Sequence, residues 1–300
     1  MNANIGMKGQ YSIVVYKSNG DIKQEVDWFD NLITNKGLDL YAGSAYSSIF
    51  SMYIGSGTIA PSFSDTQLGN LVRSSSNPSH VTTKNTSSPY DTTSTYTARF
   101  NPTGDGSVTQ YITEVGCTNA GTSTNLFSRA LIKDSNGTPI SIALKTDEYL
   151  DLTYRIVFYP SLGDTTGSIT LRGTTHTYIS RVANVATNNI NSLRGEFYPS
   201  SGYVGLYSGP IGLITGLPTT TDESSKQMPN LYNDTYTAGS YRRTGGVVIG
   251  LTSGNFTNGI QSMLINTSTG MQYQVGFTPR ILKTSNDILT LKFGFSWGRS

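Results

Sequence analysis

Apolar and polar residues alternate along two long stretches of the chain, and this alternation predicts β-strands. Residues 150–158 carry Leu, Leu, Tyr, Ile and Phe at every second position, and residues 289–297 carry Leu, Leu, Phe, Phe and Trp in the same way. Successive side chains of a strand point to opposite faces, so each stretch predicts a strand with one buried and one polar face. Each of these strands is expected to close a domain.

Helical periodicity is confined to residues 34–43, where one short helix is predicted. Thr34 or Asn35 is expected to cap its start, and its buried side would carry Leu38, Leu40 and Tyr41. Elsewhere, short apolar runs are separated by turn signals, with Asn-Gly pairs beginning at Asn19 and Asn136. The chain is therefore predicted to be all-β, with antiparallel β-sandwich or barrel-like domains.

Three short sequences recur in the same order in the two halves of the chain, which points to a duplication. Tyr53-Ile54-Gly55 returns as Tyr203-Val204-Gly205, Thr95–Ala98 returns as Thr235–Ala238, and Leu144-Lys145-Thr146 returns as Leu282-Lys283-Thr284. The third pair precedes the two alternating strands. We expect tandem domains at residues 1–160 and 161–300, joined by a turn-rich junction at 160–167. A single large sandwich or barrel is the alternative.

Several sequence motifs in the first half, together with the last residues, occur in an order that resembles structural proteins of tailed bacteriophages. The motifs are Trp28–Leu38, Tyr53–Gly57, Pro61–Leu68, Thr113–Gly116, Leu126–Ile132, Asp147–Tyr154 and Phe295–Arg299. Proteins of this kind are tail, fibre, collar or appendage components. The resemblance implies a virion protein that is assembled in the host cytoplasm and that contacts copies of itself and other tail or neck proteins.

The composition shows a polar surface with few charges. Charged residues make up 13% of the chain, and the net charge is +2 with no basic run, so no electrostatic footprint for nucleic acid is expected. No apolar stretch is long enough for a membrane-spanning helix, and the first ten residues lack the apolar core of a secretory signal. We expect neither membrane insertion nor a nucleic-acid partner.

Two segments rich in Ser, Thr and Asn are predicted to be long exposed loops. They cover residues 73–95, with Val81 and Tyr90 as the only large apolar residues, and residues 218–234. Long loops with few core-forming residues are usually functional or disordered. We therefore expect both segments to contact neighbouring subunits in an assembly.

Candidate catalytic or metal-binding residues are few. The single cysteine, Cys117, lies in a predicted strand and is expected to be a buried thiol. His80 and His176 have no Cys, His or carboxylate neighbours at ligand spacing, so neither a metal nor another cofactor is expected. A Ser-His-Asp arrangement cannot be tested from sequence spacing, but no nucleophile elbow precedes a helix.

Carboxylate pairs with the composition of a glycosidase site are Asp27 with Asp30, Asp147 with Glu148, and Asp222 with Glu223. Carboxylates in turns and at helix caps have the same sequence pattern, and this is the interpretation that we favour for all three pairs. No catalytic residue is therefore predicted, and the chain is expected not to be an enzyme.

Tyrosines are the better candidates for contacts with a partner, because tyrosine supplies rigid, amphipathic contact area. Six of them crowd one part of the second half: Tyr198, Tyr203, Tyr207, Tyr232, Tyr236 and Tyr241. They would contact another subunit or stack on a host glycan. The leading hypothesis is a non-enzymatic virion component that forms a symmetric oligomer. A glycan-binding tail adhesin is the alternative, followed by a polysaccharide depolymerase.

Overall fold

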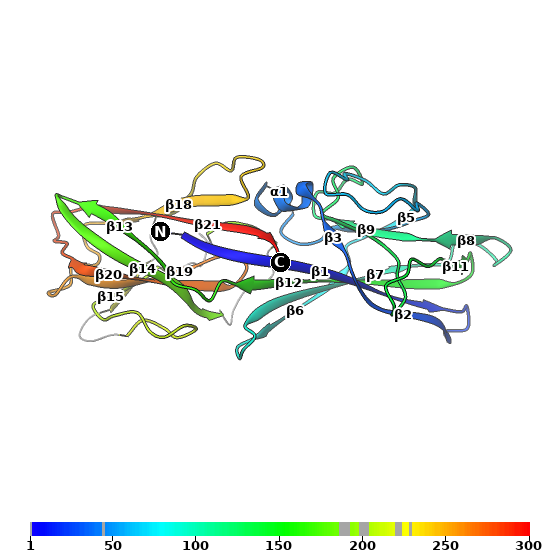
Figure 1. Cartoon of the computed structure of the whole chain (residues 1–300), viewed down its shortest axis with the longest axis horizontal. Coiled ribbons are helices and arrows are strands. Elements are labelled where there is room, and N and C mark those ends of the chain that lie inside the picture. Colours follow the sequence, from blue (N-terminus) through cyan, green and yellow to red (C-terminus); the bar gives the residue numbers. More distant parts are fainter. Residues whose placement is uncertain (1, 44–45, 186–192, 198–203, 220–223, 228–229) are drawn as a thin grey trace. The chain divides into compact units, whose positions relative to one another are not determined.

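The computed structural model describes residues 2–43, 46–185, 193–197, 204–219, 224–227 and 230–300. Within these residues the protein consists of β-strands and one helix, α1 (Asn35–Gly43), which confirms the all-β prediction (Figure 1). The hydroxyl of Thr34 accepts a hydrogen bond from the Gly37 amide (2.7 Å), as an N-cap residue does. Leu38, Leu40 and Tyr41 are buried, as predicted.

The chain divides into two compact units. The N-terminal unit contains residues 7–83, 93–157 and 299–300, and the C-terminal unit contains residues 1–6, 84–92 and 158–298. The main change of unit therefore falls at residue 158, close to the domain boundary expected at 160. Two short segments from the first half group with the second unit, and the last two residues group with the first.

The N-terminal unit has two sheets and a separate hairpin. Its first sheet has the order β2 (Ile22–Asp30), β1 (Asn2–Tyr16), β12 (Tyr149–Pro160), β7 (Asp91–Phe100), β6 (Ser79–Asn85). Its second sheet has the order β3 (Leu32–Ile33), β10 (Ser128–Leu131), β9 (Glu114–Thr118), β4 (Ser51–Gly55), β5 (Leu71–Ser76). The hairpin pairs β11 (Ile142–Lys145) with β8 (Thr109–Ile112).

The C-terminal unit also has two sheets. One has the order β13 (Thr165–Leu171), β14 (Thr174–Val185), β20 (Met271–Ile281), β19 (Ile260–Asn266), β15 (Val204–Tyr207), β16 (Ser224–Gln227). The other has the order β17 (Asn230–Asn233), β18 (Arg242–Ile249), β21 (Leu289–Arg299), followed by β1. The apolar positions of the alternating strands β12 and β21 are buried with few exceptions, which places them in the cores.

The strand orders of the two units match, in agreement with the predicted duplication. The order β3-β10-β9-β4-β5 corresponds to β14-β20-β19-β15-β16, and the order β6-β7-β12 corresponds to β17-β18-β21. In both sets the corresponding strands follow one another in the same sequence along the chain. β4 and β15, which carry the repeated Ile54-Gly55 and Val204-Gly205, occupy equivalent places.

A turn before each closing strand repeats in atomic detail. The Lys145 amide donates to the Glu148 carboxylate (2.8 Å), and the Thr284 amide donates to the Asp287 carboxylate (2.9 Å). In both turns the amide of the acidic residue donates back to the carbonyl of the first residue (3.1 Å in each). Glu148 therefore corresponds to Asp287. The repeated Leu-Lys-Thr would instead align Glu148 with Asn286, so the second copy has one extra residue between this repeat and the closing strand.

One of the three sequence repeats does not occupy equivalent positions. Thr95–Ala98 lies in β7, whereas Thr235–Ala238 lies between β17 and β18, outside any strand. This short match therefore arises by chance, and it gives no support to the duplication.

The prediction of two long exposed loops was wrong. Residues 73–95 form most of β5, all of β6 and the start of β7, and residues 218–234 contain β16 and β17. Ser and Thr suit a strand that is buried on one side only, because every second side chain faces water. In β6 the His80 ring stacks on Tyr96 of β7 (ring centroids 4.5 Å apart), so a histidine makes the contact that an apolar residue would make in other strands.

Candidate functional site

Residues of the phage-like motifs meet in the interior of the N-terminal unit, around the carboxylate of Glu114 in β9. Glu114 is fully buried. Its carboxylate accepts hydrogen bonds from the backbone amides of Gly57 (2.8 Å), Gly69 (3.1 Å) and Asn70 (2.8 Å). It also accepts one from Nε of Arg129 (2.8 Å). One buried charge thus fixes both ends of the segment that connects β4 to β5.

Arg129 in β10 extends this network to the middle of the same segment. Its guanidinium donates to the Asp65 carboxylate (2.6 Å) and to the Ile59 carbonyl (2.9 Å). Burial alone would lower the pKa of Arg129, but the hydrogen bonds and charges of Asp65 and Glu114 outweigh it and raise the pKa. The ion-pair network Glu114–Arg129–Asp65 therefore keeps the Arg129 guanidinium charged and holds residues 57–70 against the sheet.

Glycines of these motifs allow the close approach that the network requires. A Cβ added to Gly57 would lie 2.3 Å from the Glu114 carboxylate, and one added to Gly55 would lie 2.6 Å from the Asn70 carbonyl oxygen. Neither distance is compatible with a side chain. The Gly-x-Gly at residues 55–57 therefore makes room for the Glu114 carboxylate and the Asn70 carbonyl.

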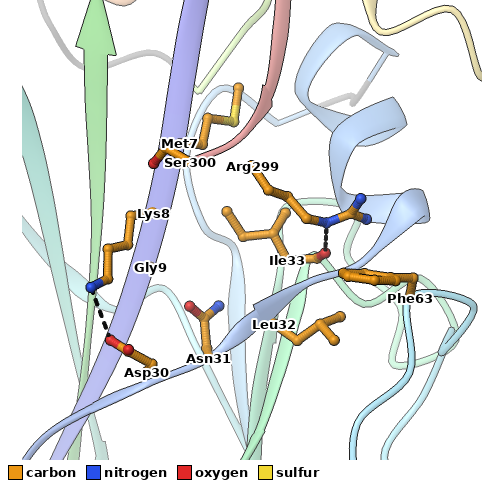
Figure 2. Close-up of a pocket in the computed structure, with 10 residues that line it drawn as sticks. All are labelled: Met7, Lys8, Gly9, Asp30, Asn31, Leu32, Ile33, Phe63, Arg299 and Ser300. Atoms are coloured by element: carbon orange, nitrogen blue, oxygen red, sulfur yellow. Dashed lines mark hydrogen bonds and ion pairs between the residues drawn. The ribbon is translucent and has the colours of Figure 1, made fainter.

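A pocket of about 330 Å³ lies between β1, the β2–β3 junction, Phe63 and the last two residues (Figure 2). Arg299 donates from Nε to the Ile33 carbonyl (2.6 Å) and from Nη2 to Oδ1 of Asn35 (2.7 Å). Its guanidinium carbon lies 4.1 Å from the centre of the Phe63 ring. Asn31 projects from the strand junction toward Gly9 (Figure 2). Two neutral oxygens and the face of the Phe63 ring thus hold the Arg299 guanidinium in place.

On the other side of this pocket, Lys8 and Asp30 form an ion pair (3.3 Å). The Gln10 side chain also donates to Asp30 (2.7 Å). Both charges of this pair lie at the surface, where screening by water makes such pairs weak. Lys8 and Asp30 are thus engaged with each other rather than with the pocket.

Three carboxylates of the pairs that resembled a glycosidase site, Asp27, Asp30 and Glu148, have partners within the fold. Asp30 accepts from Lys8 and Gln10, as above, and Asp27 accepts from the Trp28 amide (2.7 Å). Glu148 accepts from Lys23 (2.7 Å) and caps the turn before β12. Oδ1 of Asp147 is buried without a hydrogen-bond partner. Asp222 and Glu223 lie outside the described residues.

Four of the six candidate tyrosines lie within the described residues, and all four are partly buried: Tyr207, Tyr232, Tyr236 and Tyr241. Tyr198 and Tyr203 lie outside the described residues. Part of each of the four residues is thus open to a partner, and their role in contacts with a subunit or a glycan stays a prediction.

Among the four described tyrosines, Tyr236 and Tyr241 contact each other. The Tyr241 amide donates to the Tyr236 hydroxyl (3.3 Å), and the Tyr236 ring packs beside Trp297 with centroids 5.7 Å apart. Tyr232 covers Gly246 of β18, whereas Tyr207 belongs to the other sheet and covers Gly205. The predicted tyrosine cluster is thus split between two sheets.

Cys117 is buried beside the hydroxyl of Ser128, as predicted. Burial in these surroundings raises the pKa of the Cys117 thiol to about 12. The thiolate is the reactive form of cysteine, so this side chain is chemically inert in the folded protein. It contributes to packing between β9 and β10.

We expect Cys117 to resist a thiol-specific reagent such as Ellman's reagent in mildly alkaline buffer, and to react fully in concentrated guanidinium chloride. The raised pKa and the burial act together, because modification requires the sheet to open. The rate of absorbance change with and without denaturant measures both reactions. Rapid labelling of the native protein would contradict the buried position.

Comparisons with protein-family models, with curated proteins and with solved structures find no match to this chain. Within the described residues, no three or more His, Cys, Asp and Glu side chains gather as a metal site would require. The one helix in this part of the chain is too short to cross a bilayer.

Proposed function

We propose that the chain is a non-enzymatic structural protein of a tailed-phage particle, as a tail, neck or appendage component. The observation that carries this proposal is the ion-pair network Glu114–Arg129–Asp65. The motif residues that resemble phage structural proteins are used here to fix a long segment onto a sheet. Residues selected for architecture rather than for chemistry are what a structural protein requires.

Assembly would use the polar strands at the sheet edges. Among the described residues, β6 and β5 end the two sheets of the N-terminal unit, and β17 and β16 end the corresponding sheets of the other unit. Edge strands present unpaired backbone groups that can pair with another chain. These strands replace the loops that the sequence suggested as contacts with copies of the chain and with other tail or neck proteins.

The alternative functions have less support. A glycan-binding adhesin needs open aromatic rings, whereas the four described tyrosines are partly buried. A depolymerase needs a carboxylate pair free to act on a sugar, whereas Asp30 and Glu148 are occupied by lysines. Both alternatives stay predictions, which sugar-binding and reducing-end assays on the purified chain would test.

The proposed role is tested by the variant Val81→Lys in edge strand β6, where the Val81 side chain is 63% exposed. A new charge at an edge opposes strand pairing. If two copies meet there, a cost of about 1.4 kcal/mol or more reduces incorporation about tenfold. Incorporation is measured by quantitative mass spectrometry of purified particles from cells that produce either form. Thermal stability should change little, because this is a surface substitution.

The matched control is Val108→Lys, in the loop before β8, where the side chain is 56% exposed. It adds the same charge beside the separate β8–β11 hairpin rather than on β6, and should leave incorporation unchanged. Absence of the unsubstituted protein from purified particles would contradict the virion role itself. Equal incorporation of both variants would contradict only the role of the β6 edge.

A further inference from the structure

The C-terminal unit contains a pocket of about 600 Å³ that the proposed function does not use. It lies between the turn that joins β13 to β14 and the connection from β20 to β21. Sites for small molecules typically have volumes of about 300–1,000 Å³. The pocket is thus large enough for a compact ligand, and its lining determines which kind.

Positive charge exceeds negative charge in this lining. Arg172, Arg280 and Lys283 face a single carboxylate, Asp287. Asp287 is already paired with Arg172 and caps the turn that begins at Thr284. Arg280 makes no hydrogen bond or ion pair within the described residues. Two cations therefore remain for a ligand, and they favour an anion.

Lys283 is an unusual residue for such a position, because only 5% of its surface is exposed. Its ammonium donates to the Asn255 side chain (2.8 Å) and to the Thr284 carbonyl (3.3 Å), which are both neutral. Burial lowers the pKa of Lys283. An ammonium has three N–H groups, and a buried charge is costly unless it is paired. The nearby Asp287 charge offsets the effect of burial only in part, and Asp287 is itself paired with Arg172, so a bound anion would supply a direct partner for Lys283.

His176 adds a polar atom to the same wall. Its Nδ1 lies 2.7 Å from the Pro279 carbonyl oxygen, which can only accept a hydrogen bond. In the neutral ring the proton is therefore on Nδ1, and Nε2 is left for a ligand or a water molecule. His176 is almost fully buried, so its position is fixed.

The rest of the pocket is aliphatic. Leu282 and Ile288 line it with 72% and 62% of their surfaces exposed, and no Phe, Tyr or Trp is present among the described residues that line it. Sugar sites usually offer an aromatic face for stacking. Aliphatic side chains instead cover an alkyl chain, because they gain from the burial of apolar surface.

The turn at the pocket's edge is held in an uncommon conformation. Arg172 has φ of +50°, and the adjoining Gly173 has φ of +80°. A two-residue hairpin turn of this kind prefers Asn-Gly or Asp-Gly, and arginine seldom adopts a positive φ. The arginine here places its guanidinium on Asp287, and this neutralises the only carboxylate that would repel an anion.

We propose that this pocket binds a small amphipathic carboxylate, that is, a carboxylate attached to an aliphatic chain. Arg280 and Lys283 bind the carboxylate, since the guanidinium fork matches its two oxygens. Leu282 and Ile288 cover the alkyl chain. Free fatty acids from the host cell have this chemistry, and so do shorter aliphatic carboxylic acids.

Isothermal titration calorimetry of the full chain with decanoate, below the concentration at which decanoate forms micelles, tests the proposal. We expect one decanoate per chain, much weaker binding of acetate, and no binding of decyltrimethylammonium at this site. The first comparison tests the alkyl chain and the second tests the charge. Equal binding of decanoate and decyltrimethylammonium, or binding of inorganic phosphate as strong as that of decanoate, would overturn the proposal.

Three variants test whether decanoate binds in this pocket. Arg280→Gln should weaken decanoate binding about tenfold or more, because a hydrogen bond to a charged group is worth about 1.5–3 kcal/mol. Ile288→Ser should weaken the binding of decanoate and leave that of acetate unchanged. Lys292→Gln removes an exposed charge on β21 that lies outside the pocket, and it should have no effect. Unchanged affinity of a folded Arg280→Gln protein would show that decanoate binds elsewhere and would overturn the assignment.

Discussion

Glu114→Gln is expected to destabilise the N-terminal unit by about 3–5 kcal/mol, the usual cost of removing one partner of a buried ion pair. The Glu114 carboxylate accepts hydrogen bonds from the Gly57, Gly69 and Asn70 amides and from Arg129. The new glutamine side chain would add two N–H donors of its own to a site where four N–H groups already need acceptors. The Arg129 charge would also lose Glu114, the fully buried one of the two carboxylates with which it is paired, and keep only the half-buried Asp65.

Denaturant unfolding followed by tryptophan fluorescence measures this effect. The chain has two tryptophans, Trp28 in the N-terminal unit and Trp297 in the other, so a Trp297→Phe background reports on the first unit alone. Glu25→Gln is the matched control, because Glu25 is exposed on β2 and its replacement should cost less than about 0.5 kcal/mol. A cost below about 1 kcal/mol for Glu114→Gln would show that the network contributes little to stability.

The local elements of the fold were predictable because their signals lie within a few residues of each other. The helix could be placed from the cap at Thr34 and the apolar residues that follow it. The closing strands β12 and β21 could be placed from their alternation, which fixes the buried face of a strand without knowledge of its neighbours. The exact bounds of shorter strands depend on pairing and were less clear.

The polar strands β5, β6, β16 and β17 were missed for a physical reason. A strand at a sheet edge gains hydrogen bonds on one side and buries only every second side chain, so it needs few apolar residues. In β6 the buried side is supplied by His80 and Thr82, which bond to each other (2.9 Å).

The buried ion-pair network was beyond sequence reasoning because its parts lie far apart along the chain. Glu114 and Arg129 are on neighbouring strands, but Asp65 belongs to a connection whose path is set only by the folded sheet. A charged residue inside an apolar strand, as in Thr113-Glu114-Val115-Gly116, is the signal that a buried partner exists. The identity of that partner is a long-range property.

Gly37→Ala is expected to destabilise the N-terminal unit by about 1–3 kcal/mol, as over-packing of a well-packed contact does. A Cβ at Gly37 would lie 2.1 Å from the Phe127 carbonyl oxygen and 2.8 Å from the Phe127 carbonyl carbon. These are backbone atoms, and the same oxygen accepts the Thr34 amide (3.0 Å) at the start of α1, so it cannot move aside without loss of that bond. Alanine is otherwise the better helix residue by about 1 kcal/mol, so the steric cost must exceed this gain.

Gly43→Ala in the same helix is the matched control for Gly37→Ala, because a Cβ at Gly43 would have no neighbour within 4 Å. Without a clash, only the gain in helix propensity remains, and stability should stay the same or rise slightly. Thermal unfolding of both variants, followed by the fluorescence of Trp28 in the Trp297→Phe background, measures the difference. Opposite shifts are expected, and they would show that Gly37 is required by its contact with Phe127 rather than by the flexibility of the helix. Equal shifts would contradict this close contact between α1 and the segment that leads into β10.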